Sequence, residues 1–289
     1  HMKFWGVEKF DVIVMNPPYQ IQQEGNSKTH PLWDKFVIKT LNQIVESGYL
    51  VAVHPDGWRN VDGMFKNVQT LLKSRQLLYL EIHDYSDGLK TFRVKTTYDF
   101  YCLHNVPNTM FTKIKGSDGI IERVDISKME FIPNGMYKEF EKLIAKNGEE
   151  TVSIINNSSY HHQRPHMAKE QTEEFKYPCV WTTLSTDVIN FWYSNTNEKG
   201  HFEIPKVIFT TGTASKPIID ENGNYGLTEF ASAVVDEVKN LPFIQKAMLH
   251  PDFIKLMNFR DGNGGKFGHR YDRKVIATFR KDFWKEFLY

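Results

Sequence analysis

Cysteine is scarce in this chain. Its 289 residues include two cysteines, Cys102 and Cys179, which are too few for a disulfide framework or a cysteine-based metal site. The chain also has no apolar run long enough to cross a bilayer, and its first residues do not have the shape of a signal peptide. These absences exclude a disulfide-rich secreted class and predict a cytoplasmic protein with no membrane partner.

An excess of charge of either sign is also lacking. The 36 Lys and Arg residues nearly balance the 35 Asp and Glu residues, for a net charge of +1. A basic surface for nucleic acid must therefore be local. Aromatic residues, at 14%, are numerous enough to leave rings for binding surfaces. The length allows one large domain or two moderate ones.

The most informative stretch is residues 10–20, FDVIVMNPPYQ. Residues 11–15 are an apolar, β-branched run, which predicts a strand buried on both faces. Pro17 and Pro18 cannot continue a sheet ladder, so they end the strand and hold Asn16 extended. In open α/β sheets, ligands bind just beyond the carboxyl ends of strands. Asn16 and Tyr19 are therefore expected at a ligand-binding edge, although a plain Pro-Pro turn with a surface tyrosine would have the same sequence.

Asn16-Pro17-Pro18-Tyr19 resembles the catalytic motif of amino-methyltransferases that use S-adenosylmethionine (SAM). The closest resemblance is to the adenine-N6 DNA methyltransferases of the Eco57I-type restriction-modification methylase family. It implies that the Asn16 side-chain oxygen and the Pro17 carbonyl accept hydrogen bonds from the target amine, which frees its lone pair for attack on the methyl group. It also implies that Tyr19 stacks on a flipped-out base.

The resemblance extends to residues 91–103, which contain FRVKTTYDFYCL. It implies that Phe92 closes over the flipped base, with Tyr98 as second choice. A plain core ring at Phe92 is the simpler alternative.

The order of elements in residues 1–132 predicts an α/β fold, namely a partial Rossmann-like methyltransferase sheet. Apolar periodicity predicts helices over 30–45 and 60–76, strands over 48–55 and 96–105, and a strand running into a loop over 77–88. This alternation is typical of a mostly parallel sheet with crossover helices. The resemblance implies that these residues form the catalytic part of the methyltransferase domain.

Residues 133–289 have a different character, because Gly, Asn and Thr become frequent and regular alternation stops. We expect a bridging helix over 135–150, and strands over 204–235 around a hairpin turn at residues 220–223. The style of this region is similar to the target-recognition domains of Eco57I-type methylases. It predicts an α+β domain that binds double-stranded DNA.

The end of the chain has the best basic footprint. Residues 255–285 contain nine basic and three acidic residues, and basic residues on glycine-rich loops mostly contact phosphate. A solvated charged loop is the alternative interpretation. The expected DNA-binding residues are Arg164, Lys255, Arg260, Lys266, Arg270, Arg273 and Lys274.

The stretch SSYHHQRPH contains His161, His162 and His166. A metal site requires further ligands, and the sequence shows no matching cluster of cysteines or carboxylates nearby. Adjacent histidines also rarely face one ion together. We therefore predict no metal site here, but a loop that contacts a DNA groove with Arg164.

The cofactor site is the missing part of the pattern. The resemblance implies SAM as cofactor, held by a glycine-rich loop and an acidic residue that lie upstream of the Asn-Pro-Pro-Tyr motif. Only fifteen residues precede Asn16, and the glycine-rich residues 259–268 do not follow a buried strand. We therefore expect the catalytic and recognition portion without the SAM-binding half, and a separate SAM-binding half or subunit is a candidate partner. No SAM-binding residue is assigned, and activity of this chain alone is left open.

Two alternatives remain. One is a non-catalytic DNA-binding specificity subunit or fragment, which the missing SAM loop favours and the intact motif opposes. The other is a protein-glutamine or RNA amino-methyltransferase, which shares the four residues. The long region after the catalytic sheet favours DNA over this second alternative.

Overall fold

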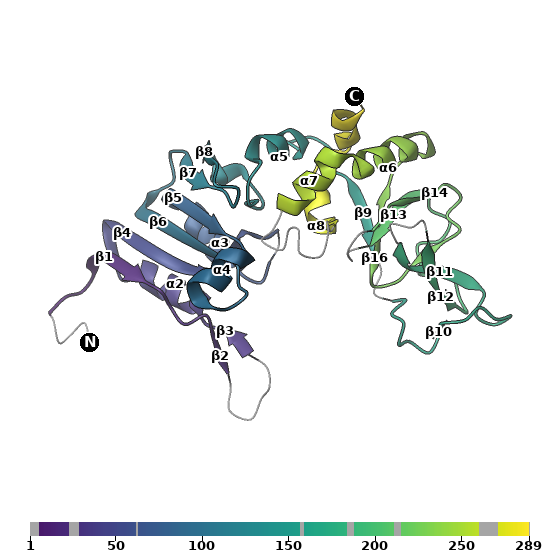
Figure 1. Cartoon of the computed structure of the whole chain (residues 1–289), viewed down its shortest axis with the longest axis horizontal. Coiled ribbons are helices and arrows are strands. Elements are labelled where there is room, and N and C mark those ends of the chain that lie inside the picture. The colour runs from purple at the N-terminus through teal and green to yellow at the C-terminus, as the bar shows by residue number, and fades with distance from the viewer. Residues whose placement is uncertain are drawn as a thin grey trace. The chain divides into compact units, whose positions relative to one another are not determined.

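The computed structural model describes residues 6–22, 29–61, 63–156, 159–183, 188–210, 215–259 and 271–288. They form two compact units, which divide after Tyr137 (Figure 1). No helix in the described part of the chain has the length and apolar character that a membrane span requires.

The first unit contains a long sheet, a short hairpin and several helices. The sheet strands are β1 (Phe10–Met15), β4 (Ile44–Pro55), β5 (Arg75–His83), β6 (Tyr98–Pro107), β7 (Thr112–Lys115) and β8 (Ile121–Val124). The hairpin strands are β2 (Gln20–Gln22) and β3 (Thr29–Pro31). The helices are α2 (Trp33–Leu41), η1 (Asp56–Arg59), α3 (Lys66–Lys73), α4 (Tyr85–Phe92) and η2 (Ile126–Lys128).

The sheet has the strand order β1-β4-β6-β5-β7-β8. β1 is parallel to β4 and β5 is parallel to β7, whereas β6 is antiparallel to both β4 and β5. The α/β class is thus confirmed. β1, β4, β5 and β7 run in one direction, as a mostly parallel sheet requires, but β6 and β8 run against them. β6 is antiparallel because α4 returns the chain to the sheet at the edge where β5 ends, so that Tyr98 at the start of β6 pairs with His83.

One face of this sheet is covered by α2 and α3, which contact β4, β5 and each other. Leu50, Leu80 and Tyr101 are fully buried on that face. On the other face Val12 is 54% exposed and Val14 is 73% exposed. The prediction that this first strand is buried on both faces is therefore wrong, because β1 lies at the sheet edge and α2 covers one side only.

Helix α4 occupies residues that the sequence predicts as a loop. Asp84 caps it, since its carboxylate accepts hydrogen bonds from the backbone N–H groups of Ser86 and Asp87. Gly88 allows close packing, because a Cβ atom there would lie 1.9 Å from the Thr96 carbonyl oxygen. The helix thus positions its last residue, Phe92, beside the start of β6.

The second unit contains two four-stranded sheets, with the orders β10-β12-β11-β15 and β14-β13-β16-β9. The first sheet comprises β10 (Met167–Ala168), β11 (Tyr177–Thr183), β12 (Ile189–Ser194) and β15 (Gly226–Leu227). The second comprises β9 (Ser153–Asn156), β13 (Lys206–Thr210), β14 (Ile218–Asp220) and β16 (Ala231–Val235). The helices are α5 (Tyr137–Leu143), η3 (Val238–Asn240), α6 (Leu241–Leu249), α7 (Pro251–Phe259), α8 (Arg273–Ile276) and η4 (Phe283–Phe287).

The predicted hairpin at residues 220–223 is not formed. Asp220 ends β14, which pairs with β13, whereas β15 pairs in parallel with β11 of the other sheet. The Asp220 carboxylate is buried, and it accepts hydrogen bonds from the Lys206 ammonium and from the backbone N–H groups of Asn224 and Tyr225. This turn, fixed by the buried Asp220 carboxylate, carries the chain from one sheet to the other, which explains why a turn sequence does not make a hairpin here.

Candidate active site at the edge of the first sheet

Four strand ends meet at one edge of the sheet in the first unit. β1 ends at Met15 and the parallel β4 ends at Pro55. Pro55 pairs with Tyr98 at the start of β6, and Tyr98 pairs with His83 at the end of β5. Ligands of α/β sheets bind at edges of this kind.

The motif residues 16–19 follow β1 directly at this edge. Asn16 and Pro18 are exposed, while Pro17 is buried. A hydrogen bond holds the backbone of the motif at Tyr19: the backbone N–H of Leu32 donates to the Tyr19 carbonyl oxygen at 3.1 Å. The Asn16 side chain has no hydrogen-bond partner among the described residues. Its amide oxygen is therefore free to accept a hydrogen bond from a substrate amine.

The predicted base-stacking rings are brought together around Tyr19. The ring centroids of Tyr19 and Phe92 are 6.0 Å apart at an interplanar angle of 75°. Phe92 contacts Tyr98 in a similar edge-to-face arrangement, at 4.9 Å and 78°. Residues from two separate stretches of sequence thus form one aromatic cluster that includes Tyr19 of the motif.

The Tyr19 hydroxyl is buried and has no hydrogen-bond partner in the described part of the chain. Burial, with a smaller contribution from Tyr98, raises the pKa of Tyr19 to about 12. Tyr19 is therefore a neutral phenol at neutral pH. An unpaired buried hydroxyl is costly, so a ligand that offers a hydrogen bond to it would gain affinity.

Tyr98 is the buried member of this aromatic cluster. It is 6% exposed, it stacks on His83 with centroids 4.3 Å apart at 3°, and its hydroxyl lies 3.3 Å from the Thr91 hydroxyl. With one face on His83 and Phe92 against its ring, Tyr98 is placed to hold Phe92. Neither the position of His83 nor helix α4 is among the features predicted from the sequence, although the Asp-x-Ser-Asp pattern at residues 84–87 is a helix-capping signal.

A buried polar network underlies the edge. Arg59 is 2% exposed, and its Nε donates a hydrogen bond of 2.8 Å to the carboxylate of the fully buried Asp99. The same carboxylate oxygen accepts a hydrogen bond of 2.8 Å from Trp58 Nε1. Trp58 is 1% exposed, so it is a core residue that packs and also holds the Asp99 carboxylate. His54, at the end of β4, stacks on Trp33 and bonds to the Tyr101 hydroxyl at 3.0 Å.

The predicted DNA-binding residues belong to the second unit, so far as the structure describes them. Arg164, Lys255 and Lys274 are exposed, and Arg273 is half-buried on α8. Arg260, Lys266 and Arg270 lie outside the described residues.

The basic excess near the end of the chain is partly neutralised. Arg280 forms ion pairs of 2.5 Å with Asp282 and Glu286, and Lys281 forms one of 2.9 Å with Glu150. Two of these acidic partners, Glu286 and Glu150, lie outside residues 255–285, so the charge count for that range does not include them. The free basic surface is thus smaller than the local charge count indicates.

The histidine stretch also departs from its sequence interpretation. Glu229, from the loop after β15, lies 2.6 Å from His162 Nδ1 and 3.5 Å from His161 Nε2. The prediction that no carboxylate matches these histidines is therefore wrong. Glu229 follows His162 by 67 positions in the sequence, so no local pattern indicates the contact.

An Asn-Pro-Pro-Tyr motif at a strand end, with an exposed amide and an aromatic cluster, has the features of the amino-methyltransferase class. Comparison with known proteins narrows this class. Residues 1–92 match the family model described as Eco57I restriction-modification methylase. Over 76 residues the chain is 33% identical to a Mycoplasma pneumoniae protein named as an uncharacterized adenine-specific methylase. The predicted resemblance to this family is thereby confirmed for the part that contains the motif.

A solved structure resembles the chain over a greater length. The type IIL restriction-modification enzyme MmeI, in complex with DNA, covers 92% of this chain with a TM-score of 0.53 and 8% identity. At this identity the likeness concerns the fold alone. The matched regions span 46% of MmeI and 18% of the Mycoplasma protein, so the chain corresponds to less than half of either relative.

Proposed function

We propose that this chain is the catalytic and target-recognition portion of a site-specific DNA adenine-N6 methyltransferase of the restriction-modification type. It would transfer a methyl group from SAM to a flipped-out adenine. The observation that carries the proposal is the exposed amide of Asn16, which has no partner among the described residues, in the same motif as Tyr19 of the Tyr19–Phe92 ring pair. The family match over residues 1–92 and the fold shared with a DNA-bound restriction-modification enzyme support it.

Asn16 and Pro17 would activate the amine. The exocyclic nitrogen of adenine is a poor nucleophile because its lone pair is delocalised into the ring. Two acceptors on its hydrogens, the Asn16 side-chain oxygen and the Pro17 carbonyl, favour a pyramidal nitrogen and localise that lone pair. The localised lone pair would then be available to accept the methyl group that SAM supplies when bound, and the amine would lose one proton to solvent.

Tyr19 and Phe92 would hold the base. A base in a duplex cannot present its amine to the enzyme, so it must leave the stack. The two rings now meet at 75°, and a flat base needs two roughly parallel faces. Phe92 must therefore turn when the base enters. The chain leaves α4 directly after Phe92, at Arg93, whose backbone is left-handed with φ of 59°, and Tyr98 limits how far Phe92 can move.

SAM supplies the electrophilic methyl group when it is bound, and we assign no described residue to its binding. The uncovered face at β1 is the surface on which a SAM-binding half or subunit would pack. Val12, Val14 and Tyr49 are exposed there by 54%, 73% and 39%. Contiguous exposed apolar side chains mark interaction surfaces. Val14→Glu should therefore lower methyl transfer without affecting DNA affinity.

DNA binding would involve the second unit, through the exposed Arg164, Lys255 and Lys274. Such contacts to phosphate fix the protein on the duplex and make the affinity dependent on salt. Chromosomal DNA as substrate fits the cytoplasmic location that the sequence predicts.

The proposal is tested by incubating the chain, reconstituted with a SAM-binding half or subunit, with tritiated SAM and unmethylated DNA of mixed sequence. The digested nucleosides are then identified by mass spectrometry. N6-methyldeoxyadenosine is the expected product. Methylated cytosine, a methylated protein glutamine, or no transfer by the reconstituted enzyme would contradict the proposal.

A further inference from the structure

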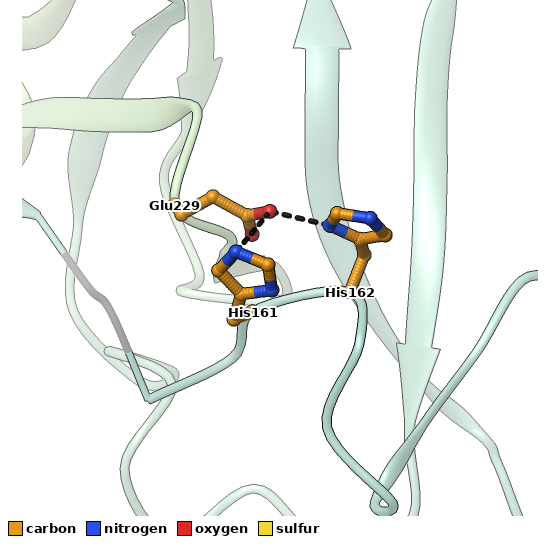
Figure 2. A group of neighbouring side chains, drawn as sticks. All are labelled: His161, His162 and Glu229. Carbon is orange, nitrogen blue, oxygen red and sulfur yellow. Dashed lines mark hydrogen bonds and ion pairs between the residues drawn. The ribbon is translucent and has the colours of Figure 1, made fainter. Parts of the chain in front are cut away.

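We propose that His161, His162 and Glu229 form a binding site for one divalent transition-metal ion in the second unit, with Zn²⁺ as the best fit. Their ligand atoms all lie within 4.8 Å of one another. Figure 2 shows the two imidazole rings and the carboxylate directed toward one another from two separate loops. This site is independent of the proposed methyl transfer.

The two adjacent histidines can share one ion because they present different ring nitrogens. His161 faces the Glu229 carboxylate with Nε2, at 3.5 Å, and His162 faces it with Nδ1, at 2.6 Å. The rings are nearly stacked, with centroids 4.7 Å apart at 21°. Because the two neighbouring histidines use different ring nitrogens, both nitrogens can face one ion without a clash between the rings.

Glu229 has an unused oxygen. Its Oε1 faces a ring nitrogen of each histidine, whereas Oε2 is buried and has no hydrogen-bond partner in the described part of the chain. The side chain as a whole is 14% exposed. A buried carboxylate oxygen without a donor is costly. A cation between the carboxylate and the imidazoles would compensate its charge.

The donor set suits zinc. Two imidazole nitrogens and one carboxylate oxygen are ordinary Zn²⁺ ligands, at about 2.0–2.2 Å from the metal, which places tetrahedral ligand atoms about 3.3 Å apart. The observed 3.5 Å is close to this spacing, and the 2.6 Å pair would need to open by less than an ångström. Three protein ligands leave a fourth position for water.

Metal binding also sets the tautomer of His161. If Nε2 binds the metal, the ring proton must be on Nδ1. In the metal-free structure Nδ1 instead accepts a weak hydrogen bond of 3.3 Å from the backbone N–H of Gln163. That bond would be lost. It is long for a hydrogen bond, so the loss is small beside a metal–nitrogen bond.

The aromatic surroundings hold the ligands in place. His162 packs edge-to-face against Trp181 and Trp192, with centroids 4.9 Å and 5.4 Å away. Trp181 in turn packs on Phe230, the residue after Glu229, at 4.5 Å. The two histidine side chains are still 39% and 28% exposed, so an ion can enter from solvent.

The ion would join the loop between β9 and β10 to the loop between β15 and β16. Arg164 is on the first loop, and its backbone N–H donates a hydrogen bond of 2.9 Å to the His161 carbonyl. A bound metal would therefore fix the segment that presents the exposed Arg164. Its primary effect is on the stability of the second unit.

The test uses the full chain, purified without a metal-affinity step, treated with EDTA and then freed of chelator. Zn²⁺ binding is measured by competition with a chromophoric chelator, and Co²⁺ is added separately to record a tetrahedral ligand-field spectrum. Glu229→Gln keeps the size of the side chain, and His161→Gln removes one nitrogen ligand. His166→Ala is the matched control, because His166 lies on the same loop but contacts the Ser159 carbonyl instead.

We expect one tightly bound Zn²⁺ per wild-type chain and per His166→Ala chain, and affinity lower by about a hundredfold in Glu229→Gln and His161→Gln. Zn²⁺ should raise the melting temperature of the first two proteins only. The proposal is overturned if the wild type binds no stoichiometric ion, or if Glu229→Gln binds as tightly as the wild type. Circular dichroism of the metal-free variants verifies that each is folded.

Discussion

The two units differ in how their candidate sites are assembled. In the first unit, four consecutive residues, Asn16 to Tyr19, supply the proposed chemistry, and the fold adds Phe92 behind them. In the second unit, the histidine–carboxylate cluster joins two loops that are 67 residues apart. A contiguous motif can be recognised in a sequence because its order is fixed by the chemistry. A cluster from distant loops becomes visible only when the sheets bring those loops together.

Each unit also contains one prominent buried ion pair, and the two pairs differ in kind. Arg59 and Asp99 pair in the first unit, and Lys206 and Asp220 pair in the second, each with a shortest distance of 2.8 Å. Arginine stays charged under all ordinary conditions, whereas a buried lysine can lose its proton. Burial indeed lowers the pKa of Lys206. The two units should therefore respond differently when the carboxylate is removed.

The largest effect is expected for Asp99→Ala. It leaves the buried Arg59 charge with only the longer ion pair of 3.4 Å to Asp56, which should cost about 3–5 kcal/mol of stability. Asp220→Ala should cost less, because Lys206 can become neutral. Hydrogen exchange resolved by peptide measures both losses, each in its own unit. Equal losses in the two variants would contradict the proposed difference.

His54 is expected to make a pH-dependent contribution of about 3 kcal/mol to the stability of the first unit. Burial lowers the pKa of His54 from 6.5 to about 4. Above pH 6.5 the histidine is neutral in both folded and unfolded states, and its contribution is fully present. As the pH falls from 6.5 to 4, the unfolded chain takes up a proton that the folded chain rejects, so stability is lost.

Comparison with His54→Gln isolates this term, because the variant lacks the titrating ring. The wild-type exchange rates in the first unit should rise more steeply below pH 6.5 than those of the variant. The second unit should show no such difference, because His54 lies in the first unit. Identical pH profiles for wild type and variant would refute the assignment to His54.

Phe92→Ala should lower methyl transfer at low DNA concentration by about 10- to 100-fold. Stacking of a base on an aromatic ring is worth about 1–3 kcal/mol. Tyr98→Phe is the control, because it keeps the ring that supports Phe92 and removes only the contact with Thr91. The measurement is kcat/KM for DNA. A Phe92→Ala enzyme as active as Tyr98→Phe would show that Phe92 is a plain core ring.

The smallest effect concerns single charges in the second unit. Arg164→Gln should weaken DNA binding by about fivefold, or about 1 kcal/mol. Lys281→Gln removes the same charge from a lysine that is paired with Glu150, so it should change the affinity little. Fluorescence anisotropy at several salt concentrations compares the two. Equal weakening would mean that only net charge matters and that Arg164 makes no particular contact.

Local patterns in the sequence predict part of this molecule well. The strand before Asn16, the proline stop and the α/β class follow from β-branched runs and from proline chemistry. Strand direction does not follow, because β6 lies between β4 and β5 for reasons that depend on the whole sheet. The exposure of Val12 and Val14 could not be predicted either, since an apolar run does not show whether its strand is at an edge.

The second unit was harder to predict for a related reason. The turn at Asp220 has hairpin composition, but a buried lysine 14 residues earlier captures its carboxylate and directs the chain to another sheet. The basic excess near the end of the chain is matched by Glu150, which lies 131 residues from Lys281. Interactions between distant residues decided both features, and no local pattern records them.

The central claim is that Asn16 provides the acceptor that activates the amine. Its most direct test is the rate of methyl transfer to DNA by Asn16→Ala, measured beside its DNA affinity. We predict a fall in the rate of about a thousandfold with an unchanged affinity, because Asn16 is exposed and bonded to none of the described residues. A variant that methylates adenine at the wild-type rate would contradict the account.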